Sequence, residues 1–92
     1  MSTVSYTGST EHTFARGGGN TSPNQRNFFF ITNTSVSDTI NVSFDGDNLN
    51  TIPIEAAGHY QPKGGENAII KVFCVTGASF VVHSDLHEHS SI

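Results

Sequence analysis

The sequence predicts an all-β chain: a small antiparallel β-sandwich or barrel of about six short strands with an extended N-terminal arm. Three observations carry this prediction. Helix-forming residues are scarce, and no segment repeats its apolar residues with the helical period of about 3.6. Short apolar or alternating runs are instead separated by turn residues at intervals of roughly 8–12 positions. The composition also changes at position 27, where a Ser-, Thr- and Gly-rich segment gives way to these runs.

Residues 1–26 are predicted to be the extended arm. Their sizeable apolar side chains are only Val4, Tyr6 and Phe14, and the stretch RGGGNTSPNQ at 16–25 has the composition of a flexible linker. Two interpretations stay open: the segment is a disordered tail, or it lies on a neighbouring subunit and is held there by Tyr6 and Phe14. Isolated aromatic residues suit the second role, because each fills one pocket at a low cost in side-chain entropy.

The predicted sandwich domain spans residues 27–85 and opens with two strands that form a hairpin. The first strand, at 27–33, reads NFFFITN and is apolar on both faces. A polar loop, TSVSD at 34–38, separates it from the second strand at 39–44. The second strand alternates, which places on one face its three apolar residues Ile40, Val42 and Phe44.

The remainder of the domain alternates between turns and strands. A piece at 51–55 contains Pro53 and is therefore expected at a sheet edge or as irregular chain, and a short piece follows at 59–62. The longest strand is expected at 67–76 and the last strand at 79–83, with turns before each of them.

The strands at 27–33 and 67–76 carry more apolar surface than one sheet face buries. In the longer strand one face carries Ile70, Val72 and Cys74, and the other carries Ile69, Phe73 and Val75. A chain of 92 residues with one cysteine has no intrachain disulfide to stabilise it, so we expect another source of stability. A second copy of the chain is the economical cover for the extra apolar face, and the N-terminal arm folding back is the alternative.

Charge and hydropathy exclude two classes of partner. The net charge is −4, and the four basic residues are dispersed along the chain, so we expect no nucleic-acid binding. No apolar run approaches the roughly 20 residues of a membrane span. The N-terminus lacks the charged and apolar regions of a signal peptide, which predicts synthesis in a reducing cytoplasm.

The candidate chemical motifs predict a protein with no catalytic, cofactor-binding or metal-binding residues. Asp45-Gly-Asp47 begins like a calcium loop, but the glycine and glutamate that an EF-hand needs further along are missing, so we expect a turn. Cys74 lies in the middle of an apolar strand and is expected to be an inert core thiol. No motif of a nucleophilic enzyme or a phosphate-binding loop appears.

The polar tail at 86–92 follows the last strand. Together with His83 it brings three histidines into seven residues, at His83, His87 and His89, which is a composition that zinc or nickel binds. Ordering a mobile tail around a metal costs entropy, and nothing in the sequence fixes the ligands. We therefore expect a solvated tail, with a metal site as the alternative.

Four stretches together resemble a known family: FITNTS at 30–35, INVSFDG at 40–46, IEAAGH at 54–59 and ASFVV at 78–82. This series is similar to the small β-sandwich structural proteins of tailed bacteriophages, which include head decoration (cement) proteins and neck or tail accessory proteins. The resemblance covers roughly residues 28–83. It implies an oligomer, with a trimer favoured, that is seated on a capsid lattice and has no catalytic residues.

The resemblance and the residues together predict a non-enzymatic virion structural protein. The expected function is capsid decoration, in which the chain is made in the host cytoplasm and then binds the major capsid protein or other virion proteins at the capsid surface. The alternatives are a neck, tail or fibre accessory subunit and, from another class, a small sugar- or ligand-binding sandwich. The residues predicted to contact a partner or a sister subunit are Tyr6, Phe14, Phe28, Phe29 and Phe30.

Overall fold

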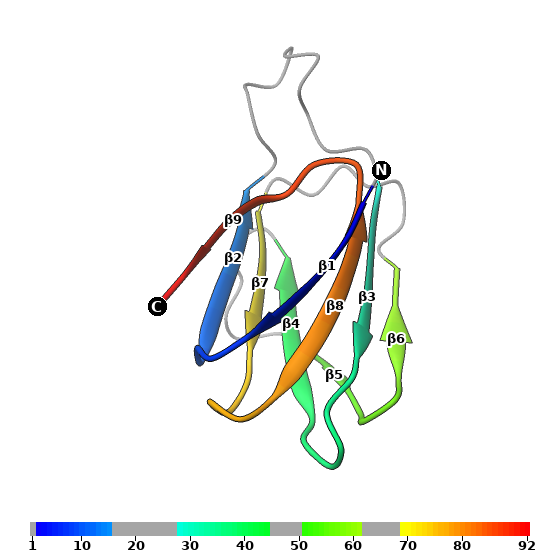
Figure 1. Cartoon of the computed structure of the whole chain (residues 1–92), viewed down its shortest axis with the longest axis vertical. Coiled ribbons are helices and arrows are strands. Elements are labelled where there is room, and N and C mark those ends of the chain that lie inside the picture. Colours follow the sequence, from blue (N-terminus) through cyan, green and yellow to red (C-terminus); the bar gives the residue numbers. More distant parts are fainter. Residues whose placement is uncertain (1, 16–27, 45–50, 62–68) are drawn as a thin grey trace.

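The computed structural model describes residues 2–15, 28–44, 51–61 and 69–92, and these residues form two antiparallel sheets packed face to face (Figure 1). The predicted all-β class is confirmed, and the architecture is a sandwich. The described residues contain nine strands, more than the sequence predicts. The additional strands come from the two ends of the chain.

Each sheet mixes strands from distant parts of the sequence. The four-stranded sheet contains, in spatial order, β1 (Ser2–Thr7), β8 (Ser79–Ser84), β3 (Phe29–Asn33) and β6 (His59–Tyr60). The five-stranded sheet contains, in spatial order, β5 (Ile52–Ile54), β4 (Ile40–Phe44), β7 (Ile69–Phe73), β2 (Glu11–Ala15) and β9 (Glu88–Ser91). Consecutive strands in the chain often lie in different sheets, so most contacts between the strands are long-range. β3 and β4 are such a pair, so the prediction that they form a hairpin is wrong: β3 pairs with β8 and β4 pairs with β7.

The N-terminal segment differs from the predicted arm. β1 pairs with β8 and β2 pairs with β7, so residues 2–15 belong to the sandwich. The physical reason is a two-residue alternation that a polar composition hides: in β2, His12 and Phe14 point inward and are buried, while their neighbours point outward. Threonine also fits a pleated, half-exposed surface well, so a Ser- and Thr-rich segment forms an edge strand readily.

The C-terminal tail also differs from the prediction. Residues 88–91 form β9, which pairs with β2 at the edge of the five-stranded sheet and sets His89 opposite Phe14. The pairing continues past the strand, because the Ile92 N–H donates to the Glu11 carbonyl oxygen at 3.0 Å. The predicted domain boundaries at residues 27 and 85 therefore do not match the limits of the two sheets.

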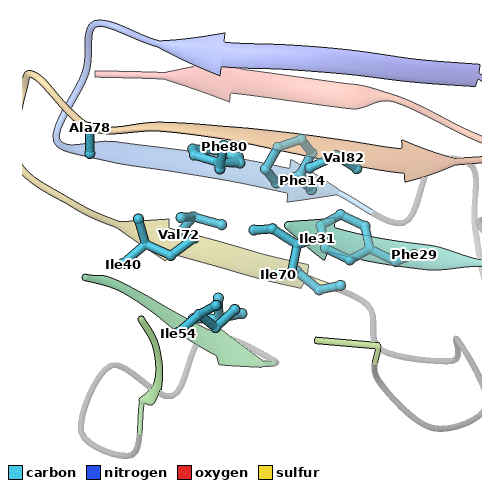
Figure 2. Close-up of a cluster of buried hydrophobic side chains, with 11 residues drawn as sticks. Phe14, Phe29, Ile31, Ile40, Ile54, Ile70, Val72, Ala78, Phe80 and Val82 are labelled. Carbon is cyan, nitrogen blue, oxygen red and sulfur yellow. The ribbon is translucent and has the colours of Figure 1, made fainter. Parts of the chain in front are cut away.

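The core lies between the two sheets and buries one apolar face of each of the two strands that are apolar on both faces (Figure 2). In β3, Phe29 and Ile31 point into the core while Phe30 points outward. In β7, Ile70 and Val72 point into the core and Ile69 and Phe73 point outward. The buried hydrophobic residues are Phe14, Phe29, Ile31, Ile40, Val42, Ile54, Ile70, Val72, Ala78, Phe80 and Val82.

Cys74 packs against this core and is half-buried. Its Sγ donates a hydrogen bond to the Ser9 carbonyl oxygen at 3.3 Å. Burial raises the pKa of the Cys74 thiol, and the negative charge of Asp38 raises it further. The thiolate is the nucleophilic form of cysteine, so this environment lowers the reactivity of the thiol.

The turn at 55–58 contains a strained residue and gives a first prediction. Ala57 has a φ of 68°, in the left-handed region that costs a residue with a Cβ about 1 kcal/mol. Its N–H donates to the Asn33 carbonyl oxygen at 2.9 Å, which holds the turn against β3. We expect Ala57→Gly to stabilise the fold by about 0.5–1 kcal/mol. Ala56→Gly is the matched control, since Ala56 has no positive φ and its replacement should destabilise the fold in urea unfolding.

Candidate partner interface

The five predicted contact residues fall into two groups in the structure. Phe14 and Phe29 are core residues, each 1% exposed, so neither is available to a partner. Tyr6 is half-buried in β1, where its ring packs against the core and lies beside the ring of His89 in β9. Phe28 and Phe30 are half-buried, and they lie on the outer face of the four-stranded sheet.

Phe28 and Phe30 each pair with a histidine on that outer face. The ring of Phe30 stacks on His59 with centroids 5.4 Å apart and an interplanar angle of 25°. The ring of Phe28 meets His83 edge-on, with centroids 5.8 Å apart and an angle of 85°. We call these four residues the aromatic–histidine face. The imidazole rings of His59 and His83 partly cover the surplus aromatic surface that the sequence shows at residues 28–30.

Hydrogen bonds hold the aromatic–histidine face in place. Thr3 Oγ1 is hydrogen-bonded to His83 Nδ1 at 2.6 Å, from the neighbouring strand. The Phe28 N–H donates to Asp85 Oδ1 at 3.1 Å, and Ser84 Oγ donates to the Phe28 carbonyl oxygen at 2.8 Å. Rigid aromatic rings beside groups that donate and accept hydrogen bonds are common in protein–protein interfaces. This face is therefore the best candidate for a partner contact among the predicted residues.

The outer face of the five-stranded sheet is a second apolar surface. Ile69 is 38% exposed and Val75 is 54% exposed, and Phe73 between them is half-buried. Their neighbours include an ion pair in which Lys71 Nζ lies 3.7 Å from Glu11 Oε2. The sequence correctly places Ile69 and Phe73 on the face opposite to Ile70 and Val72, and the described residues contain no second layer over them.

A cluster of histidines and aromatic rings closes the open side of the sandwich, and we define it as Tyr6, His12, His87 and His89. His12 Nδ1 and His89 Nε2 are 3.0 Å apart, and their rings stack at 5.2 Å. Tyr6 Oη is hydrogen-bonded to His87 Nδ1 at 2.8 Å, and the Tyr6 ring lies 4.3 Å from the His89 ring. His87 Nε2 lies 3.2 Å from the Ser2 carbonyl oxygen, which it reaches as a donor.

Burial controls the electrostatics of this histidine cluster. Loss of water lowers the pKa of His12, and a hydrogen bond to the backbone of Ser9 opposes this shift in part. Loss of water also lowers the pKa of His89, and repulsion from His12 and His87 lowers it further. Burial raises the pKa of Tyr6. Each of these shifts favours the neutral form of its group.

The three C-terminal histidines that the sequence offers as an alternative metal site lie on different elements of the structure. His89 points inward in β9, His87 precedes that strand, and His83 lies on the outer face of the other sheet. In the described parts of the chain, no group of three His, Cys, Asp or Glu residues is arranged to hold a metal ion. The Asp45–Asn50 loop and the linker at 16–25 lie outside the described residues.

Sequence reasoning missed two histidines of these surfaces. His12 belongs to the histidine cluster and His59 to the aromatic–histidine face, and neither is among the predicted contact residues. The signal for His12 is its alternation with Phe14 in EHTFA, which marks an inward-facing pair. His59 has no comparable signal, because its contact with Phe30 depends on the pairing of β6 with β3.

Comparison with known proteins adds no relative. No family model, no curated protein and no solved structure matches the chain. Within the described residues, no helix has the length and apolar character to cross a membrane.

Proposed function

We propose that the chain is a non-enzymatic structural subunit of a tailed-phage virion, and that it decorates the capsid. The resemblance of residues 28–83 to phage sandwich proteins motivates the proposal. The observation that carries it is the aromatic–histidine face, where the half-buried Phe28 and Phe30 lie just before and on β3 and each packs against a histidine. A decoration protein needs such a surface and no reaction chemistry.

The aromatic–histidine face suits attachment to a repeated lattice. Phe30 and His59 lie on strands that pair with each other, and their rings already stack. Their side chains therefore lose little conformational entropy on binding. One such contact is small, but many copies on one particle, joined to each other, bind more tightly than one copy alone. The major capsid protein is the proposed partner, and the capsid surface is the proposed location.

A neck, tail or fibre position is the second candidate of the same class. It uses the same surface, and only the number of copies per particle distinguishes it from decoration. A sugar-binding sandwich is the less favoured alternative. It needs an exposed aromatic ring such as Tyr60 for stacking, whereas Tyr60 is half-buried and packs against the core.

We expect purified virions of the phage that encodes this chain to carry it in many copies, as quantitative mass spectrometry would show. Heads stripped of the protein should rebind the wild-type chain in a sedimentation assay, and Phe30→Ala should weaken that binding by roughly tenfold or more. Phe73→Ala is the matched control, because it removes a half-buried aromatic residue from the opposite sheet.

Four outcomes of these measurements separate the candidates or contradict the proposal. A single ring of copies per particle would favour the neck or tail position over decoration. Absence of the chain from virions would contradict the whole proposal. Equal rebinding by Phe30→Ala and the wild-type chain would show that the aromatic–histidine face is not the contact, and loss of binding only in Phe73→Ala would move the contact to the other sheet.

A further inference from the structure

The two sheets end in four edge strands, and three of these carry features that oppose pairing with another chain. β6 has two residues, and β5 has three residues that include Pro53, which lacks an N–H. β9 contains Glu88, which is exposed. Short length, proline and charge are the devices by which natural sheets block their edges.

β1 is the exception among the four edges. It is six residues long, STVSYT, with neither a charge nor a proline. Five of its six residues are exposed. The exposed residues include Val4, whose side chain is 37% accessible. An uncharged edge of this length is a surface on which another strand can add.

The direction of the backbone N–H and C=O groups in β8 shows which residues of β1 point their own backbone groups toward β8 and which point them toward the open edge. The Thr34 N–H donates to the Ser79 carbonyl oxygen at 3.1 Å, so Ser79 points its backbone toward β3. Because this direction alternates along β8, the backbone groups of Phe80 and Val82 point toward β1. Their partners there are Tyr6 and Val4.

The residues that alternate with those partners point their backbone N–H and C=O groups away from β8 for the same reason. These are Thr3, Ser5 and Thr7. Their N–H and C=O groups form a free row along the edge. Among the described residues, no backbone hydrogen bond outside the strand ladders uses this row.

We propose that this free row binds β1 of a second copy of the chain, antiparallel and centred on Ser5. Ser5 then faces the partner's Ser5, and Thr3 faces the partner's Thr7. Each such pair exchanges two N–H···O=C hydrogen bonds, so the two four-stranded sheets become one continuous sheet. This inference concerns self-association and goes beyond the proposed function.

The side chains in this register are complementary. Val4 faces the partner's Tyr6, and a β-branched residue beside an aromatic ring is a favourable cross-strand pair. The contact therefore covers the exposed Val4 side chain. On the opposite face, the hydroxyl groups of Ser5 and Thr3 meet hydroxyl groups of the partner, which are also favourable neighbours.

Symmetry favours a second copy over an unrelated strand. A twofold contact places each surface against itself, so any charge near the axis meets a like charge. β1 has no charged side chain, so two copies of it meet at the axis without repulsion between like charges. The result is a closed dimer instead of the trimer that the family resemblance favours.

The first test is the mass of the full chain in solution, by light scattering over a wide range of concentration. We expect a dimer, and we expect Ser5→Glu to raise its dissociation constant by at least roughly tenfold, because two carboxylates would meet at the axis. Ser37→Glu is the matched control, since Ser37 is exposed in a loop and the change of charge is the same. Circular dichroism verifies that both variants are folded.

The second test fixes the register by disulfide cross-linking in a Cys74→Ser background. Ser5→Cys should form a covalent dimer on mild oxidation, because residues in a hydrogen-bonded pair are about 5.5 Å apart at Cα. Thr3→Cys is the control from the same strand and face, and it should not cross-link, since it lies opposite the partner's Thr7.

The outcomes that overturn the proposal are a monomer at every concentration, a trimer, or a dimer that Ser5→Glu leaves intact. Cross-linking of Thr3→Cys in preference to Ser5→Cys would overturn the register. These results are independent of capsid binding. A dimer that fails to bind heads would contradict the proposed function alone, and a monomer that binds heads would contradict this inference alone.

Discussion

Replacing Asn33 by alanine is expected to lower the free energy of unfolding by about 3–5 kcal/mol, the largest effect of any single side chain that we consider. Asn33 is fully buried at the end of β3. Its Nδ2 donates to the Asp38 carbonyl oxygen at 2.7 Å and to the Ile54 carbonyl oxygen at 2.9 Å. Its Oδ1 accepts from the Ser35 N–H at 2.9 Å.

These bonds make Asn33 the link between the two sheets at this end of the sandwich. The residue belongs to the four-stranded sheet, whereas Ile54 ends β5 of the five-stranded sheet and Asp38 lies in the loop before β4. Alanine would leave three backbone groups without this partner, and each buried unsatisfied group costs about 1–3 kcal/mol. Alanine would also leave a small cavity.

Urea unfolding followed by circular dichroism measures the effect. Asn41→Ala is the matched control, because Asn41 is half-buried on β4 with its side chain on the outer face, and its loss should cost less than about 1 kcal/mol. Asn33→Asp should also destabilise strongly, since a carboxylate oxygen would face two carbonyl oxygens in place of Nδ2. Equal stability of Asn33→Ala and Asn41→Ala would contradict this interpretation.

The sequence indicates the central strands because their apolar residues are dense. In β4, apolar and polar residues alternate, and this two-residue period predicts both the strand and its buried face. β3 and β7 are apolar on both faces, so their composition predicts the strands but not which face is buried. Ile40 and Val42 lie in the core as the alternation indicates. The side chain of Phe44 lies outside the described set, so its predicted inward direction stays a prediction.

The strands at the two ends of the chain are hidden in the sequence because half of their pattern is polar. β1 places only Val4 and Tyr6 on its inner face, and β9 places a histidine there instead of an apolar residue. Composition therefore indicates an arm and a tail where the chain forms strands. Their pairing depends on neighbours that are distant in sequence, which local propensity does not encode.

The candidate surfaces could be predicted only in part for the same reason. Phe28 and Phe30 are visible as surplus aromatic residues, but their histidine partners come from other strands. Likewise, the His12–His89 contact joins positions 77 residues apart. Such pairs are set by strand order and register, and a single sequence carries no direct signal of either.

Lowering the pH from about 7.5 to about 5 is expected to destabilise the fold through the histidine cluster. The pKa values of His12 and His89 are lowered from their ordinary value of 6.5, chiefly by burial. The folded state therefore binds fewer protons than the unfolded state in this range. Stability from these groups is full above pH 6.5, declines as the pH falls, and is lost as the pH passes through the lowered pKa values of the folded state.

The geometry of the cluster explains why protonation is costly. The His12 Nδ1 to His89 Nε2 bond needs one donor and one acceptor, and two protonated rings would offer two donors at 3.0 Å. The Nε2 atom of His12 is buried and has no well-formed hydrogen bond among the described residues. The residues packed around this pair also include Tyr6, His87 and Phe80, none of which supplies a negative charge at these pH values.

The adjacent carboxylates do not compensate, because alternation places Glu11 and Glu88 on the opposite face of the sheet. Loss of the histidine bond should cost about 1–3 kcal/mol. For a domain of this size, each kcal/mol lowers Tm by roughly 4–8 °C. β9 should separate from β2 first, since it is held by one ladder at the edge of its sheet.

Thermal unfolding at a series of pH values tests this prediction, together with NMR titration of the histidine ring protons. His12→Gln should reduce the slope of Tm against pH, because it removes one titrating ring and keeps a hydrogen-bonding side chain beside His89. His59→Gln is the matched control: His59 is an exposed histidine on the outer face of the other sheet, and the slope should stay close to that of the wild type. A wild-type Tm that is constant between about pH 7.5 and pH 5 would show that the His12–His89 contact does not depend on neutral rings.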